Sequence, residues 1–266
     1  MSRIPVQSRS HSLVKNLRSI RDGEEKYFIF CEGFKVIEEL LRSSLNPSEI
    51  YCVKEKEESV EKLLKFYQKT SVPLHLLSSD VMEFVSDVDS PPGVIAIARK
   101  PREREQPEEP LRKNPFFLIV HRVQLPQNVG SLLRTSEAAG VSEVWLTKGT
   151  ADPYSPKGIR GSSGSIFRLK IKTEVDLAQG MAELQKKQFS VYTATQNGSK
   201  FYDEVDWKGA AALVLGSEGG GFSEDELRLF QNTIRIPMAG KVESLNVGTA
   251  AAVCLFEAAR QRKEIS

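Results

Sequence analysis

Short apolar segments alternate with helical segments from residue 116 to the end of the chain, and this alternation restricts the possible folds more than any other feature. The segment "GAAALVLG" (209–216) is apolar throughout, as expected of a strand buried on both faces. The other predicted strands are 116–123, 141–148, 167–172, 189–196 and 233–238. Helices are predicted over 128–140, 176–188, 224–231 and 247–263. This order predicts an α/β fold with a mainly parallel sheet that helices cover on both faces.

The first 100 residues show the same alternation on a smaller scale. The predicted strands are 26–33, 48–54, 73–78 and 93–100, and the predicted helices are 34–44, 59–70 and 79–88. Between the two parts lies "ARKPREREQPEEPLRKNP" (98–115), which is charged, contains four prolines and lacks apolar periodicity. Such a composition is typical of a linker. We therefore expect a smaller α/β domain over 1–100, a linker over 101–113 and a second domain over 114–266.

The chain carries no signal for membrane insertion or secretion. It has no apolar run of about 18 residues, and "MSRIPVQSRSHSLVK" lacks the apolar core of a secretory signal. A transit peptide stays open, because this stretch has Ser and Arg and no acid; a cytoplasmic protein is the simpler expectation. Cys31, Cys52 and Cys254 lack metal-type spacing and are expected to be buried free thiols. We expect no metal site.

Basic residues gather in two stretches, although the net charge is only +2. The first stretch precedes Asp22 and includes Arg9, Lys15 and Arg18. The second, "KGIRGSSGSIFRLKIK" (157–172), contains no acid. Both are candidates for phosphate contacts, and solvated surface charge is the alternative for each.

Three junctions between a strand and a helix carry unusual polar residues. In "LVLGSEGGGFSEDEL", Gly216 and Glu218 follow the most apolar strand, and Ser223 with Glu226 forms a predicted capping box. Glycines there allow a ligand to approach the backbone, or they serve only a turn. The spacing does not match a phosphate-binding loop, and Glu218 would repel a polyphosphate.

The second junction is "QLPQNVGSLLRTSEAAG". Asn128 is the predicted N-cap of its helix. Arg134 follows two leucines that are expected to be buried, so it is placed to meet an anion or to polarise a hydroxyl. Pairing with Glu137 on the same helix is the alternative.

The third junction is "PMAGKVESLNVGTAAAVCLFEAARQR". Ser244 and Asn246 flank Leu245 just before the last helix, whereas capping needs only one polar residue. The small residues from Gly248 to Ala252 permit close approach of another segment or subunit, or simply tight core packing. In a parallel sheet all three junctions can converge on one edge, where ligands of open α/β sheets bind.

These motifs, in this order, resemble the signatures of the SpoU (TrmH-type) branch of the SPOUT RNA methyltransferases. The resemblance is strong over 114–263, and residues 9–100 more loosely resemble the N-terminal substrate-binding domain of many members. It implies a deep trefoil knot at the C-terminus, S-adenosylmethionine as cofactor, ribose 2′-O-methylation of RNA, most often ribosomal, and a homodimer that completes the active site.

Residue roles follow from the same resemblance. The implied catalytic residues are Asn128, Arg134, Glu218, Ser244 and Asn246. The implied cofactor-binding residues are Thr195, Gly216, Ile236 and Leu245. "PYSPKGIRGSSGSIFRL" resembles the substrate-side loop of the family and supplies Lys157, Arg160 and Ser162 as candidates for RNA contact, beside Arg9, Lys15 and Arg18.

The chain departs from the family pattern at Leu125 and at His121 or Arg122, where many members have acids. These departures affect the expected RNA identity more than activity. The alternatives are a transfer-RNA 2′-O-methyltransferase and a catalytically silent RNA-binding protein of the same fold. Retention of the whole polar set argues against the silent protein. A nucleotide-dependent oxidoreductase is excluded, because neither half has a dinucleotide fingerprint.

Overall fold

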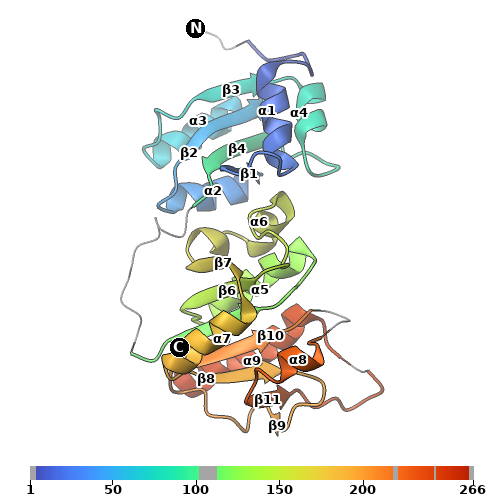
Figure 1. Ribbon diagram of the computed structural model, residues 1–266. Coiled ribbons are helices and arrows are strands. Elements are labelled where there is room, and N and C mark those ends of the chain that lie inside the picture. The colour runs from blue at the N-terminus through green and yellow to red at the C-terminus, as the bar shows by residue number, and fades with distance from the viewer. Residues whose placement is uncertain (1–3, 102–112, 218–220, 243, 264–266) are drawn as a thin grey trace. The chain divides into compact units, whose positions relative to one another are not determined.

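The computed structural model describes residues 4–101, 113–217, 221–242 and 244–263 (Figure 1). It divides into two compact units. The first holds the described residues of Met1–Arg102 together with Pro153–Arg168, and the second holds the rest. Most of the predicted linker over 101–113 lies outside the described residues. The segment 153–168, which we placed in the second domain from the sequence, packs with the first unit.

The first unit is built on a four-stranded sheet in the order β1-β4-β2-β3. Its strands are β1 (Phe28–Glu32), β2 (Pro47–Val53), β3 (Leu74–Leu77) and β4 (Val94–Arg99). β4 is antiparallel to both neighbours, whereas β2 and β3 are parallel. Its helices are α1 (Ser12–Arg21), α2 (Phe34–Arg42), α3 (Glu57–Phe66), α4 (Ser79–Val85) and α6 (Pro156–Ser162).

Two of these helices were not predicted, because we interpreted their segments by charge and by Gly/Ser content alone. α1 buries Val14, Leu17 and Ile20, whose spacing places them on one helical face. α6 begins with Ser155 as N-cap and Pro156 in its first turn, a start signal that the sequence contains. Apolar spacing and capping would therefore have found both helices.

The second unit is a seven-stranded sheet in the order β7-β6-β5-β10-β8-β11-β9, and all its strand pairs are parallel. Its strands are β5 (Phe116–Val120), β6 (Glu143–Thr147), β7 (Ile171–Val175), β8 (Ser190–Ala194), β9 (Lys200–Phe201), β10 (Ala211–Leu215) and β11 (Asn232–Arg235). Its helices are α5 (Pro126–Ala138), α7 (Leu177–Lys186), α8 (Glu224–Leu227) and α9 (Val247–Arg262). The predicted α/β class and parallel sheet are confirmed.

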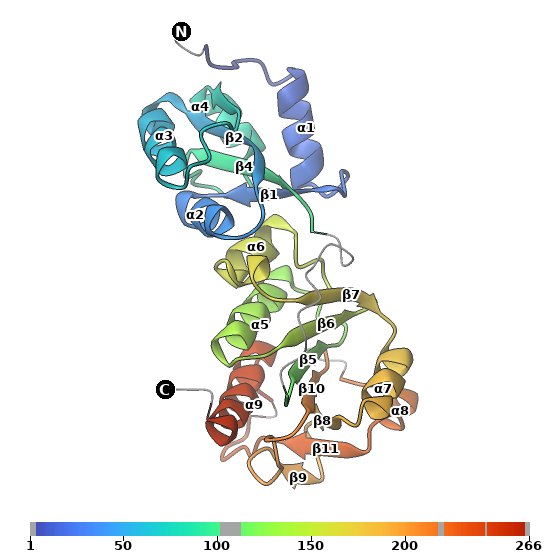
Figure 2. The same cartoon turned by 90° about the vertical axis from the view of Figure 1, so that its left-hand side faces the viewer.

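Helices cover both faces of this sheet (Figure 2): α5 and α9 lie on one face, and α7 and α8 on the other. On the α7 side, Leu177, Met181 and Leu184 pack against alternate strand residues such as Ile119 and Val214. β5 and β10 are buried at every position. The continuous apolar pattern of these strands is therefore explained by two covered faces.

The cysteines and the helix lengths bear on two smaller predictions. Cys31, Cys52 and Cys254 are buried free thiols, as expected. No helix in the described parts of the chain is long and apolar enough to cross a membrane.

Candidate functional site

Three of the predicted cofactor residues meet at one edge of the seven-stranded sheet. β10, β8 and β11 are neighbours whose ends lie close in register: Leu215, the last residue of β10, lies beside Ala194, the last of β8, which lies beside Ile234, the residue before the end of β11. Thr195 and Gly216 directly follow these strand ends, and Ile236 lies one residue beyond β11. The carboxyl edge of a parallel sheet is the usual position for a ligand.

Gly216 is required by packing at this edge. A Cβ atom there would lie 2.9 Å from Cε2 of Phe222, which is closer than side-chain atoms approach. Phe222 is itself held between the stacked ring of His121, at 5.4 Å, and the edge-on ring of Phe230, at 4.9 Å. Glu218 lies outside the described residues, so its predicted role stays a prediction.

The second junction differs from the sequence prediction at its start. α5 begins at Pro126 with Leu125 as N-cap, so Asn128 lies inside the first turn and is not the N-cap as predicted. Proline fixes the backbone of the first helical residue, and the helix therefore starts two residues earlier than expected. Further along α5, Leu132 and Leu133 are completely buried, and the Arg134 side chain is exposed.

The start of α9 packs against the same helix. Asn246 is the N-cap, and its Oδ1 accepts a hydrogen bond from the Gly248 amide at 2.9 Å. A Cβ atom at Gly248 would lie 3.3 Å from Oγ of Ser131, which stands between Asn128 and Arg134 on α5. The small residue thus permits the close approach of α9 to α5 that we expected. The third junction and the Arg134 helix are adjacent for this reason.

The predicted site residues at the third junction and at the strand ends differ in how far their side chains are exposed to solvent. Ser244 and Asn246 are exposed, and Leu245 is half-buried, as are Thr195 and Ile236. The arrangement therefore offers small or apolar half-buried groups at the strand ends and exposed polar groups where α9 meets α5.

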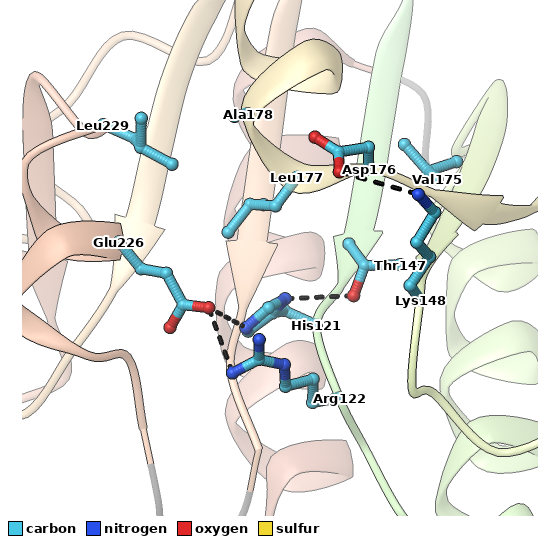
Figure 3. Close-up of a pocket in the computed structure, with 10 residues that line it drawn as sticks. All are labelled: His121, Arg122, Thr147, Lys148, Val175, Asp176, Leu177, Ala178, Glu226 and Leu229. Atoms are coloured by element: carbon cyan, nitrogen blue, oxygen red, sulfur yellow. Dashed lines mark hydrogen bonds and ion pairs between the residues drawn. The ribbon is translucent and has the colours of Figure 1, made fainter.

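A pocket of about 260 Å³ opens at the carboxyl ends of β5, β6 and β7 (Figure 3). Buried His121 lies at its centre, with Nδ1 3.0 Å from Oγ1 of Thr147 and Nε2 3.2 Å from Oε1 of Glu226. Arg122 Nη1 is 3.1 Å from the same carboxylate oxygen. Among the residues that the structure describes, none of the predicted catalytic or cofactor residues lines this pocket. In the sequence, His121 and Arg122 were noticed only as departures from the family pattern, and Glu226 only as part of a capping box.

Burial lowers the pKa of His121, and the nearby Glu226 opposes this shift only in part. Burial acts to raise the pKa of Glu226, but hydrogen bonds from Ser223 and the adjacent His121 and Arg122 outweigh it, so the net shift is downward. Ser223 and Glu226 form the predicted capping box of α8. The backbone N–H of His121 also donates to Leu215 O at 2.8 Å, which links the pocket wall to the end of β10.

Of the basic candidates near the N-terminus, Lys15 and Arg18 lie on α1, and Arg9 precedes it. The guanidinium groups of Arg9 and Arg18 lie over the ring of Phe84, at 4.8 and 4.6 Å from its centre. Lys15 is exposed. These cations remain available at the surface, and RNA contact by them stays a prediction.

The candidates on α6 have different environments. Lys157 is exposed, whereas Arg160 Nη2 is 2.6 Å from Asp87 and Nη1 is 3.8 Å from buried Glu32. Ser162 is completely buried, and its hydroxyl donates to Ile159 O. Arg160 thus links α6 to Glu32 and Asp87 of the first unit, whereas the Ser162 hydroxyl bonds within α6 itself, and RNA contact by both residues stays a prediction.

Among the residues that the structure describes, no group of three or more His, Cys, Asp or Glu side chains is arranged to hold a metal ion.

The chain is similar to known RNA methyltransferases in sequence and in structure. Residues 115–256 match the model of the SpoU rRNA Methylase family, and residues 30–104 match the model described as RNA 2′-O ribose methyltransferase substrate binding. A 23S rRNA (guanosine(2553)-2′-O)-methyltransferase of Bacillus subtilis is 30% identical, over 94% of this chain and 97% of the relative. A tRNA (guanosine(18)-2′-O)-methyltransferase of Thermus thermophilus is 36% identical, over 62% of this chain and 85% of the relative. The crystal structure of an AdoMet-bound rRNA methyltransferase from Sinorhizobium meliloti superimposes with a TM-score of 0.82 and 25% identity, over 97% of each chain.

Proposed function

The chain belongs to the SpoU rRNA methylase family, and on this basis we propose that it methylates a ribose 2′-OH of 23S ribosomal RNA with S-adenosylmethionine as methyl donor. The observation that carries the proposal is the meeting of family motifs in space: Thr195, Gly216 and Ile236 at three adjacent strand ends, and Asn246 where α9 packs on the Arg134 helix.

The strand-end residues fit an adenosyl group. Thr195 and Gly216 are small, and Ile236 and Leu245 offer apolar, half-buried contacts for a purine ring. When bound, the cofactor supplies a methyl group that its sulfonium already activates. The protein therefore needs only to align the ribose hydroxyl and to manage one proton.

Arg134 stabilises the negative charge that develops on the ribose oxygen. A guanidinium keeps its proton at neutral pH, so it acts as an electrostatic and hydrogen-bonding group rather than as the base. In this proposal the Asn246 side-chain amide N–H groups act on the reacting region, while its Oδ1 accepts the hydrogen bond of the helix cap. Asn128, Ser244 and Glu218 complete the polar set in this proposal.

Ribosomal RNA is favoured over transfer RNA by the extent of the matches. The rRNA enzyme of B. subtilis matches both units, whereas the tRNA enzyme of T. thermophilus matches 62% of the chain. The first unit also matches a substrate-binding domain. A homodimer in the cytoplasm and a knotted C-terminal segment belong to the same proposal. Phe256, which is 40% exposed on α9, supports a subunit contact on that helix.

The proposal is tested by adding purified protein and radiolabelled S-adenosylmethionine to unmodified 23S rRNA and tRNA transcripts, and by mapping 2′-O-methyl sites in the product. We expect label in 23S rRNA at one ribose and micromolar cofactor binding by calorimetry. Label only in tRNA would support the alternative substrate. Cofactor binding without transfer to either RNA would contradict the proposed reaction.

Asn246 provides a test that separates capping from catalysis. Asn246→Asp keeps an oxygen for the Gly248 amide and places a negative charge at a helix N-terminus, so the free energy of unfolding should change by less than about 0.5 kcal/mol. The aspartate lacks the amide N–H groups, and we expect methyl transfer to fall at least about tenfold. Asn246→Ala should lose the same activity and, in addition, about 1 kcal/mol of stability. Normal activity of the Asp variant would show that Asn246 is only a cap.

A further inference from the structure

One face of α3 combines lysines with an exposed aromatic ring. Lys62, Lys65 and Phe66 are spaced i, i+3 and i+4 on α3 and so lie on one side of the helix, and Lys69 follows shortly after the helix ends at Phe66. Phe66 is 76% exposed, and the Lys62 side chain is 74% exposed. We name these four residues the α3 face.

Phe66 has no packing role that explains its presence. α3 is anchored to the first unit by Val60 and Leu64, which are buried on the opposite side of the helix. The Phe66 ring contacts the edge of Tyr67, with ring centres 4.9 Å apart. Tyr67 is in turn fixed by Arg42, whose Nε donates to its hydroxyl at 2.8 Å. A rigid neighbour therefore supports the ring while its surface stays open to solvent.

The charges along α3 are separated by sign. Glu57, Glu58 and Glu61 lie in the first half of the helix, and the three lysines lie toward its end. Lys62 pairs with Glu58, and Lys69 donates to Asn46, but both lysines remain at the surface. Exposed pairs of this kind are weak and exchange readily for a phosphate. The C-terminal end of the face is therefore positive around an exposed aromatic ring.

An exposed aromatic ring among lysines is typical of surfaces that bind unpaired nucleic acid. Bases stack on aromatic side chains, and lysines contact the backbone phosphates on either side. On α4, by contrast, the half-buried Phe84 ring is already covered by Arg9 and Arg18. Phe66 is thus the better stacking platform of the two.

We propose that the α3 face binds single-stranded RNA of the substrate, with one unpaired base stacked on Phe66 and the flanking phosphates held by Lys62, Lys65 and Lys69. The inference rests on the proposed function, since it names the surface by which the first unit holds the RNA.

The test measures binding of unmodified 23S rRNA transcript by the full-length protein at several salt concentrations. Stacking of one base is worth about 5- to 100-fold in affinity, so Phe66→Ala should weaken binding by that factor and Phe66→Trp should restore it. Lys65→Ala should reduce the slope of log affinity against log salt by about one. Tyr27→Ala is the matched control, because Tyr27 is also an exposed aromatic residue of the first unit, at 64%, and should leave affinity within twofold.

Equal affinities of wild type and Phe66→Ala, or equal losses for Phe66→Ala and Tyr27→Ala, would overturn the inference. The inference would also be overturned if Phe66→Ala left RNA affinity unchanged but abolished binding of another protein. Failure of the proposed function looks different: the wild type itself would neither bind nor methylate RNA. Cofactor binding should be the same in all variants, because every substitution lies in the first unit.

Discussion

Arg134→Ala should lower kcat/KM for methyl transfer by at least about 10²- to 10³-fold, the usual loss when a group that stabilises developing oxyanion charge is removed. Affinity for S-adenosylmethionine should stay within about twofold, because the predicted cofactor residues lie on the strand ends and not on α5. The free energy of unfolding should change by less than about 0.5 kcal/mol, since Arg134 is exposed while Leu132 and Leu133 anchor the helix.

The controls use the same position and the same helix. Arg134→Lys keeps the charge without the planar, two-pronged donor group and should recover only part of the rate. Gln127→Ala changes another exposed residue of α5 and should leave the rate unchanged. Single-turnover kinetics and calorimetry separate the effects. A near-normal rate for Arg134→Ala would rule out a catalytic role.

Arg160→Ala should destabilise the first unit by about 2–3 kcal/mol. The substitution leaves Glu32, whose side chain is 1% exposed, without its nearest cation. An uncompensated buried charge usually costs somewhat more, but Arg160 and Asp87 are about a quarter exposed, and Glu32 keeps hydrogen bonds from Ser86 and from the Asp87 amide. Hydrogen exchange of the β1 and α6 amides should show the loss directly.

Two further variants test whether the loss of the ion pair with buried Glu32 causes the destabilisation by Arg160→Ala. Lys157→Ala lies on the same helix but is exposed, and it should change stability by less than about 0.5 kcal/mol. Adding Glu32→Gln to Arg160→Ala removes the buried charge and should recover part of the lost stability. If Arg160→Ala lowered RNA affinity without altering amide exchange, Arg160 would serve the RNA and not the fold.

Several parts of the fold followed from short stretches of sequence. The strand β10 was predicted from its apolar run, and the capping box of Ser223 and Glu226 from a four-residue pattern. The start of α5 was predicted wrongly, because Asn128 is a good N-cap residue but Pro126 begins the helix before it. α1 and α6 were not predicted, because their segments were interpreted by charge and glycine content and not by apolar spacing or capping.

For the site, the sequence predicted which residues take part but not which residues lie next to them in space. Thr195 lies beside Gly216 and Ile236 at the sheet edge because β8 lies directly between β10 and β11, and its cofactor role stays a prediction. His121 was noticed only as a departure from a pattern, and the structure makes it the buried centre of a pocket. Arg160 was expected at the RNA, and the structure surrounds it with carboxylates.

By itself, then, the sequence determined the alternation of strands and helices, the capping box of Ser223 and Glu226 and the family motifs, because these depend mainly on residues close to one another in the chain. Only the tertiary structure decided that β10 lies between β5 and β8, that α9 meets α5 at Ser131, and that α6 joins the first unit. Those outcomes depend on packing between segments far apart in the chain. Which strands and helices become neighbours is determined by the burial of whole faces, and no local sequence pattern predicts it.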